Sequence, residues 1–181
     1  SLTDFRSGFI ALIGRPNVGK STLMNQFIGE KIAIISDKPQ TTRNKIQGVY
    51  TDDETQIIFV DTPGIHKPKH KLGQYMLDMA YDTLNEVDAI LYVYDTSQEF
   101  GAGEAFILDL FQKVKTPIIL ILNKIDLIEK EEILPIIKDM SERFSFKEII
   151  PVSAKTGENS AYTLEVLKKY LPKGPKYYPE D

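Results

Sequence analysis

The chain of 181 residues contains no cysteine, which excludes disulfide bonds and metal sites built from thiolates. Long apolar runs are also missing, because stretches such as residues 118–122 are far too short to span a bilayer. Positive charge is not in excess: the net charge is −4, so bulk electrostatics do not favour nucleic-acid binding, although a local basic patch could still provide it. The composition, with 42% apolar and 27% charged residues, is that of one globular domain with a hydrophobic core.

Apolar runs typical of β-strands alternate with segments of helical periodicity along most of the chain. The strand-like runs are residues 9–13, 57–60, 89–94, 118–122 and 149–152. The helix-like segments are residues 21–28, 72–84, 104–114, 131–144 and 162–171. Strands that are apolar on both faces and separated by helices favour a parallel sheet covered on both sides. We therefore expect an α/β fold of three layers, α/β/α.

One pair of strands departs from this pattern. Residues 46–51 and 56–60 are joined by the turn-like residues 51–54, which predicts a hairpin. The expected sheet therefore has six strands, is mostly parallel and has one antiparallel edge strand. The tail, residues 172–181, is rich in proline and glycine and is expected to be a linker, so that the folded domain spans residues 1–171.

The first strand-like run leads into GRPNVGKST, residues 14–22, which fits the phosphate-loop pattern G-x-x-x-x-G-K-S between a strand and a helix. The glycines let backbone N–H groups converge on an anion, and the helix N-terminus adds its positive dipole. We expect Lys20 to reach the β- and γ-phosphates and the Ser21 hydroxyl to bind Mg²⁺. A tight turn that merely needs glycine is the alternative, which the context disfavours. The motif predicts a P-loop NTPase but fixes neither the base nor the reaction.

The base is indicated by NKID, residues 123–126, which follows an apolar strand directly. A carboxylate at Asp126 can accept hydrogen bonds from guanine N1–H and from its exocyclic amine, whereas adenine offers no such pair of donors. A buried carboxylate left unpaired against ATP would cost roughly 1–3 kcal/mol. Ser153, Ala154 and Lys155 end the next strand, where their backbone N–H groups are expected to close over the base. The combination predicts guanine recognition.

Two further loops are expected to sense the γ-phosphate. Asp61 ends a strand in DTPG, residues 61–64, where its carboxylate can hold Mg²⁺ through water and the Gly64 N–H can meet the γ-phosphate. In the polar loop PQTTR, residues 39–43, a threonine hydroxyl can bind Mg²⁺ directly. Loops held in this way are released on hydrolysis. For an isolated pair of threonines, hydrogen bonding to the local backbone is the alternative.

The five blocks GRPNVGKS, TTR, DTPG, NKID and SAK occur in this order over residues 14–155. With them the chain resembles the GTPase (G) domains of the TrmE-Era-type translation-factor GTPase family. Residues 31–49, 61–73 and 170–181 resemble the Era branch of this family. The resemblance implies a cytoplasmic GTP switch in assembly of the small (30S) ribosomal subunit, with a C-terminal KH domain that binds 16S rRNA. No KH pattern occurs in these residues, so the tail is expected to lead toward such a domain. Peripheral association with the inner face of the cell membrane is a family tendency.

The resemblance and the motifs together give the expected site. Nucleotide binding is assigned to Gly14, Arg15, Pro16, Asn17, Val18, Gly19, Lys20, Ser21, Thr22, Thr41, Thr42, Asp61, Thr62, Pro63, Gly64, Asn123, Lys124, Asp126, Ser153, Ala154 and Lys155. Hydrolysis is assigned to Lys20, Thr42, Gly64 and Asn17, and Mg²⁺ binding to Ser21, Thr42 and Asp61.

The mechanism of hydrolysis leaves two questions open. Ile65 occupies the position where Ras-like proteins carry the glutamine that orients the attacking water, so the water must be positioned by other groups. Asn17 resembles the asparagine that coordinates K⁺ in potassium-activated relatives; shaping the loop by hydrogen bonds is the equally weighted alternative. Slow turnover would favour a second interpretation, a nucleotide-sensing binding module whose hydrolysis is incidental or depends on a partner. A P-loop kinase or ATPase is disfavoured by NKID.

Overall fold

A computed structural model of the chain describes residues 4–29, 45–62 and 71–179. The expected nucleotide-binding residues Thr41, Thr42, Pro63 and Gly64, and Ile65 at the position of the Ras glutamine, lie outside these ranges. The strands are β1 (Arg6–Ile13), β2 (Lys45–Thr51), β3 (Thr55–Asp61), β4 (Ala89–Asp95), β5 (Ile118–Asn123) and β6 (Glu148–Pro151). The α-helices are α1 (Lys20–Ile28), α2 (Lys71–Glu86), α3 (Ala102–Phe111), α4 (Ile133–Arg143) and α5 (Ser160–Lys168), and two 3₁₀ turns are η2 (Ile125–Leu127) and η3 (Lys130–Glu132).

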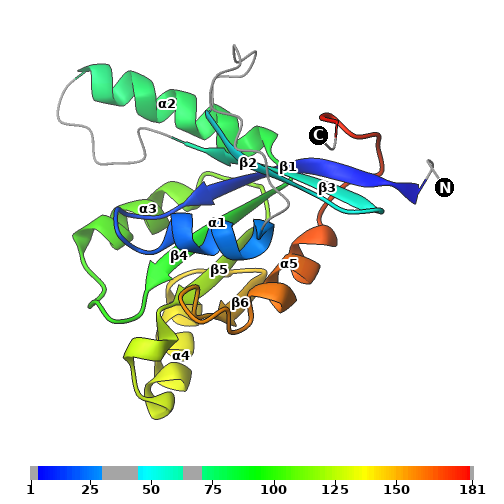
Figure 1. The fold of residues 1–181 in the computed structure, drawn as a ribbon. Coiled ribbons are helices and arrows are strands. Elements are labelled where there is room, and N and C mark those ends of the chain that lie inside the picture. The colour runs from blue at the N-terminus through cyan, green and yellow to red at the C-terminus, as the bar shows by residue number, and fades with distance from the viewer. Residues whose placement is uncertain (1–3, 30–44, 63–70, 180–181) are drawn as a thin grey trace.

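The strands form one six-stranded sheet in the order β2-β3-β1-β4-β5-β6 (Figure 1). β1 is parallel to β3 and β4, and β5 is parallel to β4 and β6. β2 at the edge is antiparallel to β3. In the turn between them, Asp52 Oδ1 accepts hydrogen bonds from the backbone N–H groups of Glu54 and Thr55, both at 2.8 Å. The predicted sheet, with its single antiparallel edge strand, is confirmed.

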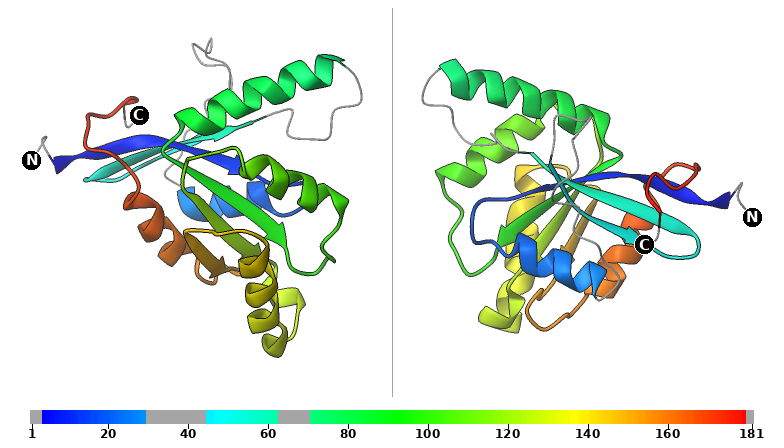
Figure 2. Two further views of the ribbon diagram at one scale, coloured as in Figure 1. Left: turned by 180° about the vertical axis from the view of Figure 1, so that it is seen from behind. Right: turned by 45° about the horizontal axis from the view of Figure 1, so that its top comes forward.

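Helices cover both faces of the sheet, so the molecule has three layers (Figure 2). On one face, α1 and α5 pack against the sheet; on the other face lie α2, α3 and α4. The alternation along β1 illustrates the arrangement, because Ile10 and Leu12 enter the first core whereas Ala11 and Ile13 enter the second. Strands buried on both faces are continuous apolar runs, and this is the pattern from which the fold class was predicted.

The ends of several elements differ from the predicted ones by a few residues. α4 begins at Ile133 rather than at residue 131 because a separate 3₁₀ turn precedes it. This turn is closed by a capping box in which the Glu129 N–H donates to the Glu132 carboxylate at 2.7 Å. α5 begins at Ser160, two residues before its predicted start at 162, and ends at Lys168. Helix ends depend on local caps, which hydrophobic spacing does not report.

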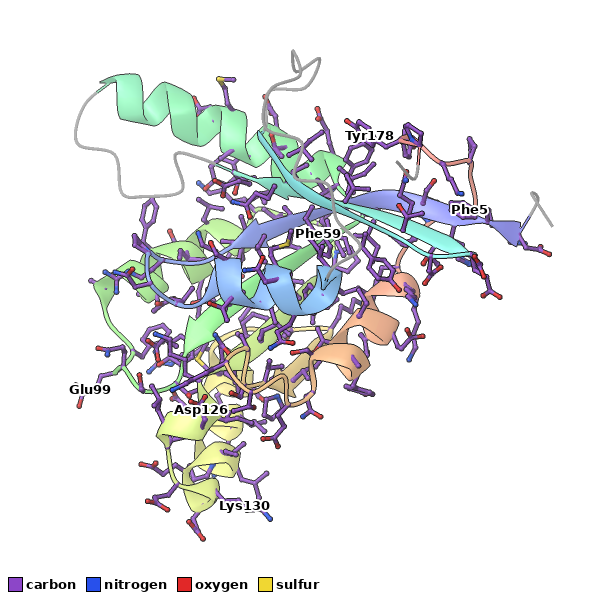
Figure 3. The ribbon with its side chains drawn as sticks, in the orientation of Figure 1. Phe5, Phe59, Glu99, Asp126, Lys130 and Tyr178 are labelled. Atoms are coloured by element: carbon purple, nitrogen blue, oxygen red, sulfur yellow. The ribbon has the colours of Figure 1, made fainter. Side chains whose placement is uncertain are left out.

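The described part of the C-terminal tail lies on the sheet. Lys173 forms an antiparallel bridge with Arg6, the Ser7 N–H donates to the Pro172 carbonyl at 3.1 Å, and the Gly174 N–H donates to the Phe5 carbonyl at 2.9 Å. Figure 3 places Phe5 and Tyr178 at the same end of the sheet. Residues expected to form a linker are thus folded against β1, while a domain beyond the tail stays a prediction.

Candidate functional site

The predicted motifs converge at one edge of the sheet. Because β1, β4, β5 and β6 are mutually parallel neighbours, their carboxyl ends point the same way (Figure 1). The phosphate loop follows β1, NKID begins with the last residue of β5, and SAK follows β6. Ligands of open α/β sheets bind at this edge.

The phosphate loop needs glycine at both of its ends because other groups approach its backbone closely. A Cβ at Gly14 would lie 2.9 Å from the Val93 carbonyl oxygen. Gly19, the N-cap of α1, has φ 98°, and a Cβ there would overlap the Asn123 amide nitrogen. Lys20 Nζ donates to the Gly14 carbonyl at 2.8 Å, so its ammonium lies over the loop. The loop backbone is therefore closely approached by other groups at both ends, and the Lys20 ammonium lies against its first residue.

Asn123 joins three of the predicted segments. Its side chain is 1% exposed, and Nδ2 donates to the Val18 carbonyl at 2.8 Å. Its Oδ1 accepts from the Ala154 N–H at 2.9 Å. One buried amide thus connects the phosphate loop to the SAK segment. The Ala154 N–H, which was expected to close over the base, donates to Asn123 in this structure.

Lys124 makes a second link to the phosphate loop. Its ammonium donates to the Asn17 carbonyl at 2.7 Å and pairs with Asp95 Oδ2 at 2.9 Å. Asn17 and Lys124 both have φ 68°, in the left-handed region that non-glycine residues seldom adopt. Asp95 was not among the predicted site residues; a carboxylate that ends an apolar strand at the ligand edge was the signal available in the sequence.

The carboxylate expected to contact guanine is oriented by a neighbour. Ser153 Oγ donates to Asp126 Oδ1 at 2.8 Å. Asp126 itself is exposed, not buried as the predicted penalty against ATP assumed. Gln26 on α1 donates to the Ala154 carbonyl at 2.8 Å and so supports the SAK segment. Nothing in the sequence indicated the contribution of Gln26, because a polar residue on an exposed helix position is common.

Arg15 of the phosphate loop lies against the start of α3. A Cβ at Gly103 would come within 2.5–2.9 Å of the Arg15 side chain, so glycine makes room for it. Beside it Glu104 is 4% exposed and accepts a hydrogen bond from the Tyr92 hydroxyl. Burial raises the pKa of Glu104, an effect that the Tyr92 hydrogen bond and the Arg15 charge only partly offset. None of these α3 contacts was predicted.

The residues expected to hold Mg²⁺ fit a magnesium ion in the part that the structure describes. Ser21 is exposed in the first turn of α1, and Asp61 ends β3 next to β1, so a hydroxyl and a carboxylate lie at the same edge. Within the described residues, no group of three or more histidine, aspartate or glutamate side chains could enclose a metal. Mg²⁺ commonly takes one or two protein oxygens and completes its shell with phosphate and water. The donor set therefore suits Mg²⁺ bound together with a nucleotide.

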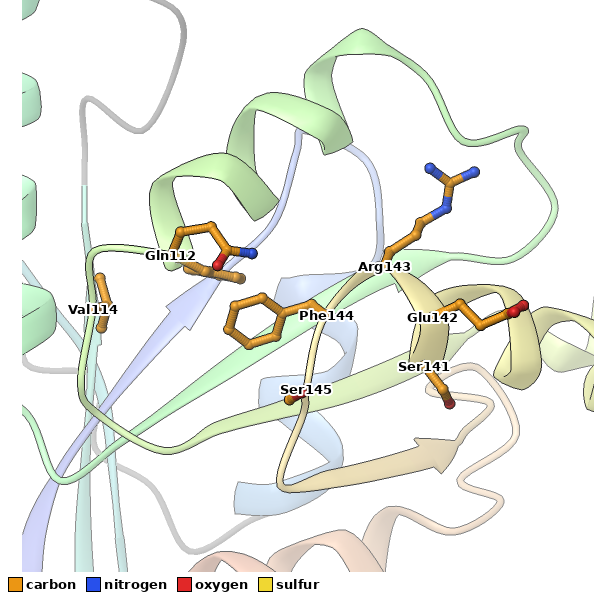
Figure 4. A pocket seen from close by; sticks show the side chains of 8 residues that line it. Gln112, Val114, Ser141, Glu142, Arg143, Phe144 and Ser145 are labelled. Atoms are coloured by element: carbon orange, nitrogen blue, oxygen red, sulfur yellow. The ribbon is translucent and has the colours of Figure 1, made fainter.

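A cavity of about 410 Å³ lies elsewhere, where the carboxyl ends of α3 and α4 meet (Figure 4). Phe111, Gln112, Phe144 and Ser145 contribute to its lining, and none of the predicted site residues does. No helix in the described part of the chain has the length and apolar character needed to cross a membrane.

The fold, the phosphate loop and the NKID and SAK segments around it define a P-loop GTPase domain. The chain belongs to the family described as 50S ribosome-binding GTPase, whose family model matches residues 9–124.

Among solved structures, the chain is similar to Aquifex aeolicus Era, crystallised as a single-residue variant bound to GDP.AlF4⁻, with 38% identity and a TM-score of 0.78. It is also similar to Era in complex with MgGDPNP and nucleotides 1506–1542 of 16S ribosomal RNA, with 39% identity and a TM-score of 0.79. Both matches cover 98% of this chain and 61% of the Era chain. The predicted resemblance to Era is confirmed.

The G domain of the T. maritima FeoB iron transporter matches 91% of this chain and 98% of its own length, with 24% identity and a TM-score of 0.63. This likeness shows the shared fold.

Proposed function

We propose that this chain binds GTP and hydrolyses it to GDP and phosphate. The observation that carries the proposal is the buried Asn123 amide, which joins the phosphate loop to the segment expected around the base. A phosphate cradle fixed in this way to a base-reading carboxylate suits a guanine nucleotide, because guanine offers two donors to Asp126. Adenine would leave that carboxylate without these partners.

The proposed roles follow from the placement of the groups. The Lys20 ammonium and the backbone N–H groups of the phosphate loop, in which Pro16 has none, bind the phosphates. Asp126, oriented by Ser153, accepts from the base. Ser21, Asp61 and Thr42 would hold Mg²⁺, which when bound neutralises charge on the phosphate oxygens. Thr42 and Gly64, both outside the described residues, are proposed to contact the γ-phosphate side.

Asn17 is proposed to help to place K⁺ during hydrolysis. Its carbonyl is held by Lys124 at 2.7 Å and its backbone is left-handed, so the residue is fixed at the exposed apex of the loop. A cation at this position would offset charge on the transferring phosphoryl group, which can accelerate phosphoryl transfer by factors of about 10³ or more.

The wider role we propose is a GTP switch in assembly of the small ribosomal subunit. The support for the small subunit is that the similar Era protein was crystallised with nucleotides of 16S ribosomal RNA. The description of the GTPase family names the 50S subunit and supports only a link to the ribosome in general. The chain spans 61% of the Era chains. Contact with rRNA and the 30S subunit is proposed to require a KH domain in addition to the G domain of residues 1–171. A cytoplasmic location, with peripheral contact to the inner membrane face, accompanies this role.

Competition binding followed by single-turnover hydrolysis tests the proposal. The chain is expected to bind GTP and GDP but not ATP, and Asp126→Asn is expected to lose guanine affinity. Equal binding of ATP would refute the GTPase assignment. Hydrolysis with Mg²⁺ is expected to be faster in K⁺ than in Na⁺ at equal ionic strength. Equally slow rates in both salts would support the nucleotide-sensing binding module instead.

A further inference from the structure

Asp95 is a buried carboxylate at the ligand edge that none of the proposed roles uses. It is the last residue of β4, pairs in register with Asn123 on β5 and is 6% exposed. Its Oδ1 accepts from the Ser97 N–H at 2.9 Å and from the Ser97 hydroxyl at 2.6 Å, and its Oδ2 pairs with the Lys124 ammonium at 2.9 Å. Both oxygens are therefore fixed, one by the loop that follows β4 and the other by NKID.

The charge on Asp95 is secure at neutral pH. Burial by itself would raise the pKa of the carboxyl, but the hydrogen bonds from Ser97 and Lys124 outweigh it and hold the pKa below its ordinary value. A half-buried ammonium needs such a counter-charge, because burying an unpaired charge is costly. The Asp95 carboxylate therefore stabilises the Lys124 ammonium in its observed position.

The position that Lys124 occupies matters for the phosphate loop. The same ammonium donates to the Asn17 carbonyl at 2.7 Å, so one cation spans Asp95 and the apex of the loop. Both Asn17 and Lys124 have left-handed backbones, which persist when surrounding contacts hold them. Without the carboxylate, the ammonium is free to turn to solvent and the link to the loop loosens.

We propose that Asp95 is a positioning residue for the guanine nucleotide. By holding Lys124 on the Asn17 carbonyl, it fixes the spacing between the phosphate loop and the base-reading segment, and it thereby sets the affinity for GDP and for GTP alike. The effect is expected to be equal for the two nucleotides because the Lys124 ammonium contacts the Asn17 main-chain carbonyl. The γ-phosphate in bound GTP is assigned instead to Thr42 and Gly64, and the K⁺ assigned to Asn17 acts only during hydrolysis. This inference rests on the proposed binding of guanine nucleotides.

The test compares wild type with Asp95→Asn, which keeps an acceptor for Ser97 and removes the charge. Affinities for GDP and for a non-hydrolysable GTP analogue are measured with fluorescent nucleotides, together with the dissociation rates. We expect both affinities to fall roughly ten- to hundredfold, the usual cost of losing a hydrogen bond to a charged group, mainly through faster dissociation. Ser97→Ala, which removes one of the bonds that orient Asp95, is expected to cause a smaller loss in the same direction.

Asp52→Asn is the matched control. Asp52 lies in the β2–β3 turn and pairs with Lys168 at 2.8 Å. This turn is beside the start of β1, whereas the nucleotide site is at the carboxyl ends of the parallel strands. Removing the charge of Asp52 is expected to leave the affinities for GDP and for the GTP analogue unchanged. A comparable loss in this variant would mean that any lost ion pair weakens binding through stability, and would overturn the proposal.

A double-mutant cycle with Lys124→Ala separates positioning from general destabilisation. If Asp95 acts through Lys124, Asp95→Asn causes no further loss of affinity in the Lys124→Ala background. Additive losses, or wild-type affinity in Asp95→Asn, would overturn the proposal while leaving the proposed GTP binding intact. Failure of the wild-type chain to bind either nucleotide would overturn both.

Discussion

Replacing Gln56 with leucine is expected to release the C-terminal tail from the sheet. Gln56 on β3 is fully buried, and its Oε1 accepts from the N–H groups of Tyr177 at 2.7 Å and Tyr178 at 3.1 Å. Its Nε2 donates to the Tyr178 carbonyl at 2.8 Å and to Thr51 Oγ1 at 3.0 Å. Leucine fills a similar volume but offers neither a donor nor an acceptor, so all four hydrogen bonds are lost together.

The magnitude follows from these four bonds. At about 0.5–1.5 kcal/mol net for each bond, their sum is roughly 2–6 kcal/mol. The lower half of this range applies, because a buried leucine contributes apolar transfer free energy that offsets part of the loss. We expect the free energy of unfolding to fall by about 2–4 kcal/mol, and Tm to fall by about 4–16 °C at about 2–4 °C per kcal/mol for a domain of this size.

Urea unfolding followed by circular dichroism measures the loss, and hydrogen exchange of the Tyr177 and Tyr178 amides shows where it occurs. The control is Gln98→Leu, at an exposed position, which is expected to change stability by less than about 0.5 kcal/mol. An equally small change in Gln56→Leu, or exchange at both tyrosines as fast in wild type as in the variant, would refute the reasoning.

Three further substitutions test the site and its surroundings. Gly19→Ala is expected to abolish nucleotide binding in a titration, because the new Cβ overlaps the Asn123 amide and the backbone is left-handed; retained affinity would contradict so close an approach of these two segments. Asn123→Ala is expected to cost about 2–4 kcal/mol in urea unfolding without nucleotide, because it leaves buried backbone groups such as the Ala154 N–H unpaired; a loss below about 1 kcal/mol would argue against this role. Burial raises the pKa of Glu104 in the folded state. Wild-type stability should therefore fall as pH rises from the ordinary carboxyl pKa of the unfolded state to the raised pKa of the folded state, whereas Glu104→Gln should show no such fall. Curves of thermal stability against pH that run parallel for the two proteins would contradict this.

Much of the fold could be predicted from the sequence because its signal is local. Apolar runs such as residues 118–122 and 89–94 are buried on both faces, and a strand of that kind needs helices on either side. The phosphate loop was predictable for a similar reason: its glycines, its lysine and its place between a strand and a helix are adjacent in the chain. The order of the parallel strands then brings NKID and SAK to the same edge.

The contacts that complete the site depend on segments far apart in the chain. Asp95 and Lys124 are 29 positions apart, and only the parallel pairing of β4 with β5 brings them together. Arg15 reaches α3 because Gly103 has no side chain, which no spacing rule would indicate. A polar residue after a strand is common, so its partner cannot be identified until the tertiary structure is known.

The sequence by itself therefore determined the layers of the domain, the phosphate loop and the class of nucleotide it is expected to bind, because these depend on periodicity and on residues that are neighbours in the chain. Only the tertiary structure decided which side chains hold those motifs in place and where the tail lies. Gln56 illustrates the difference: as one polar residue at the start of a strand it carried no signal, but in the folded domain its buried amide must find partners, and it finds them in a segment more than a hundred residues away.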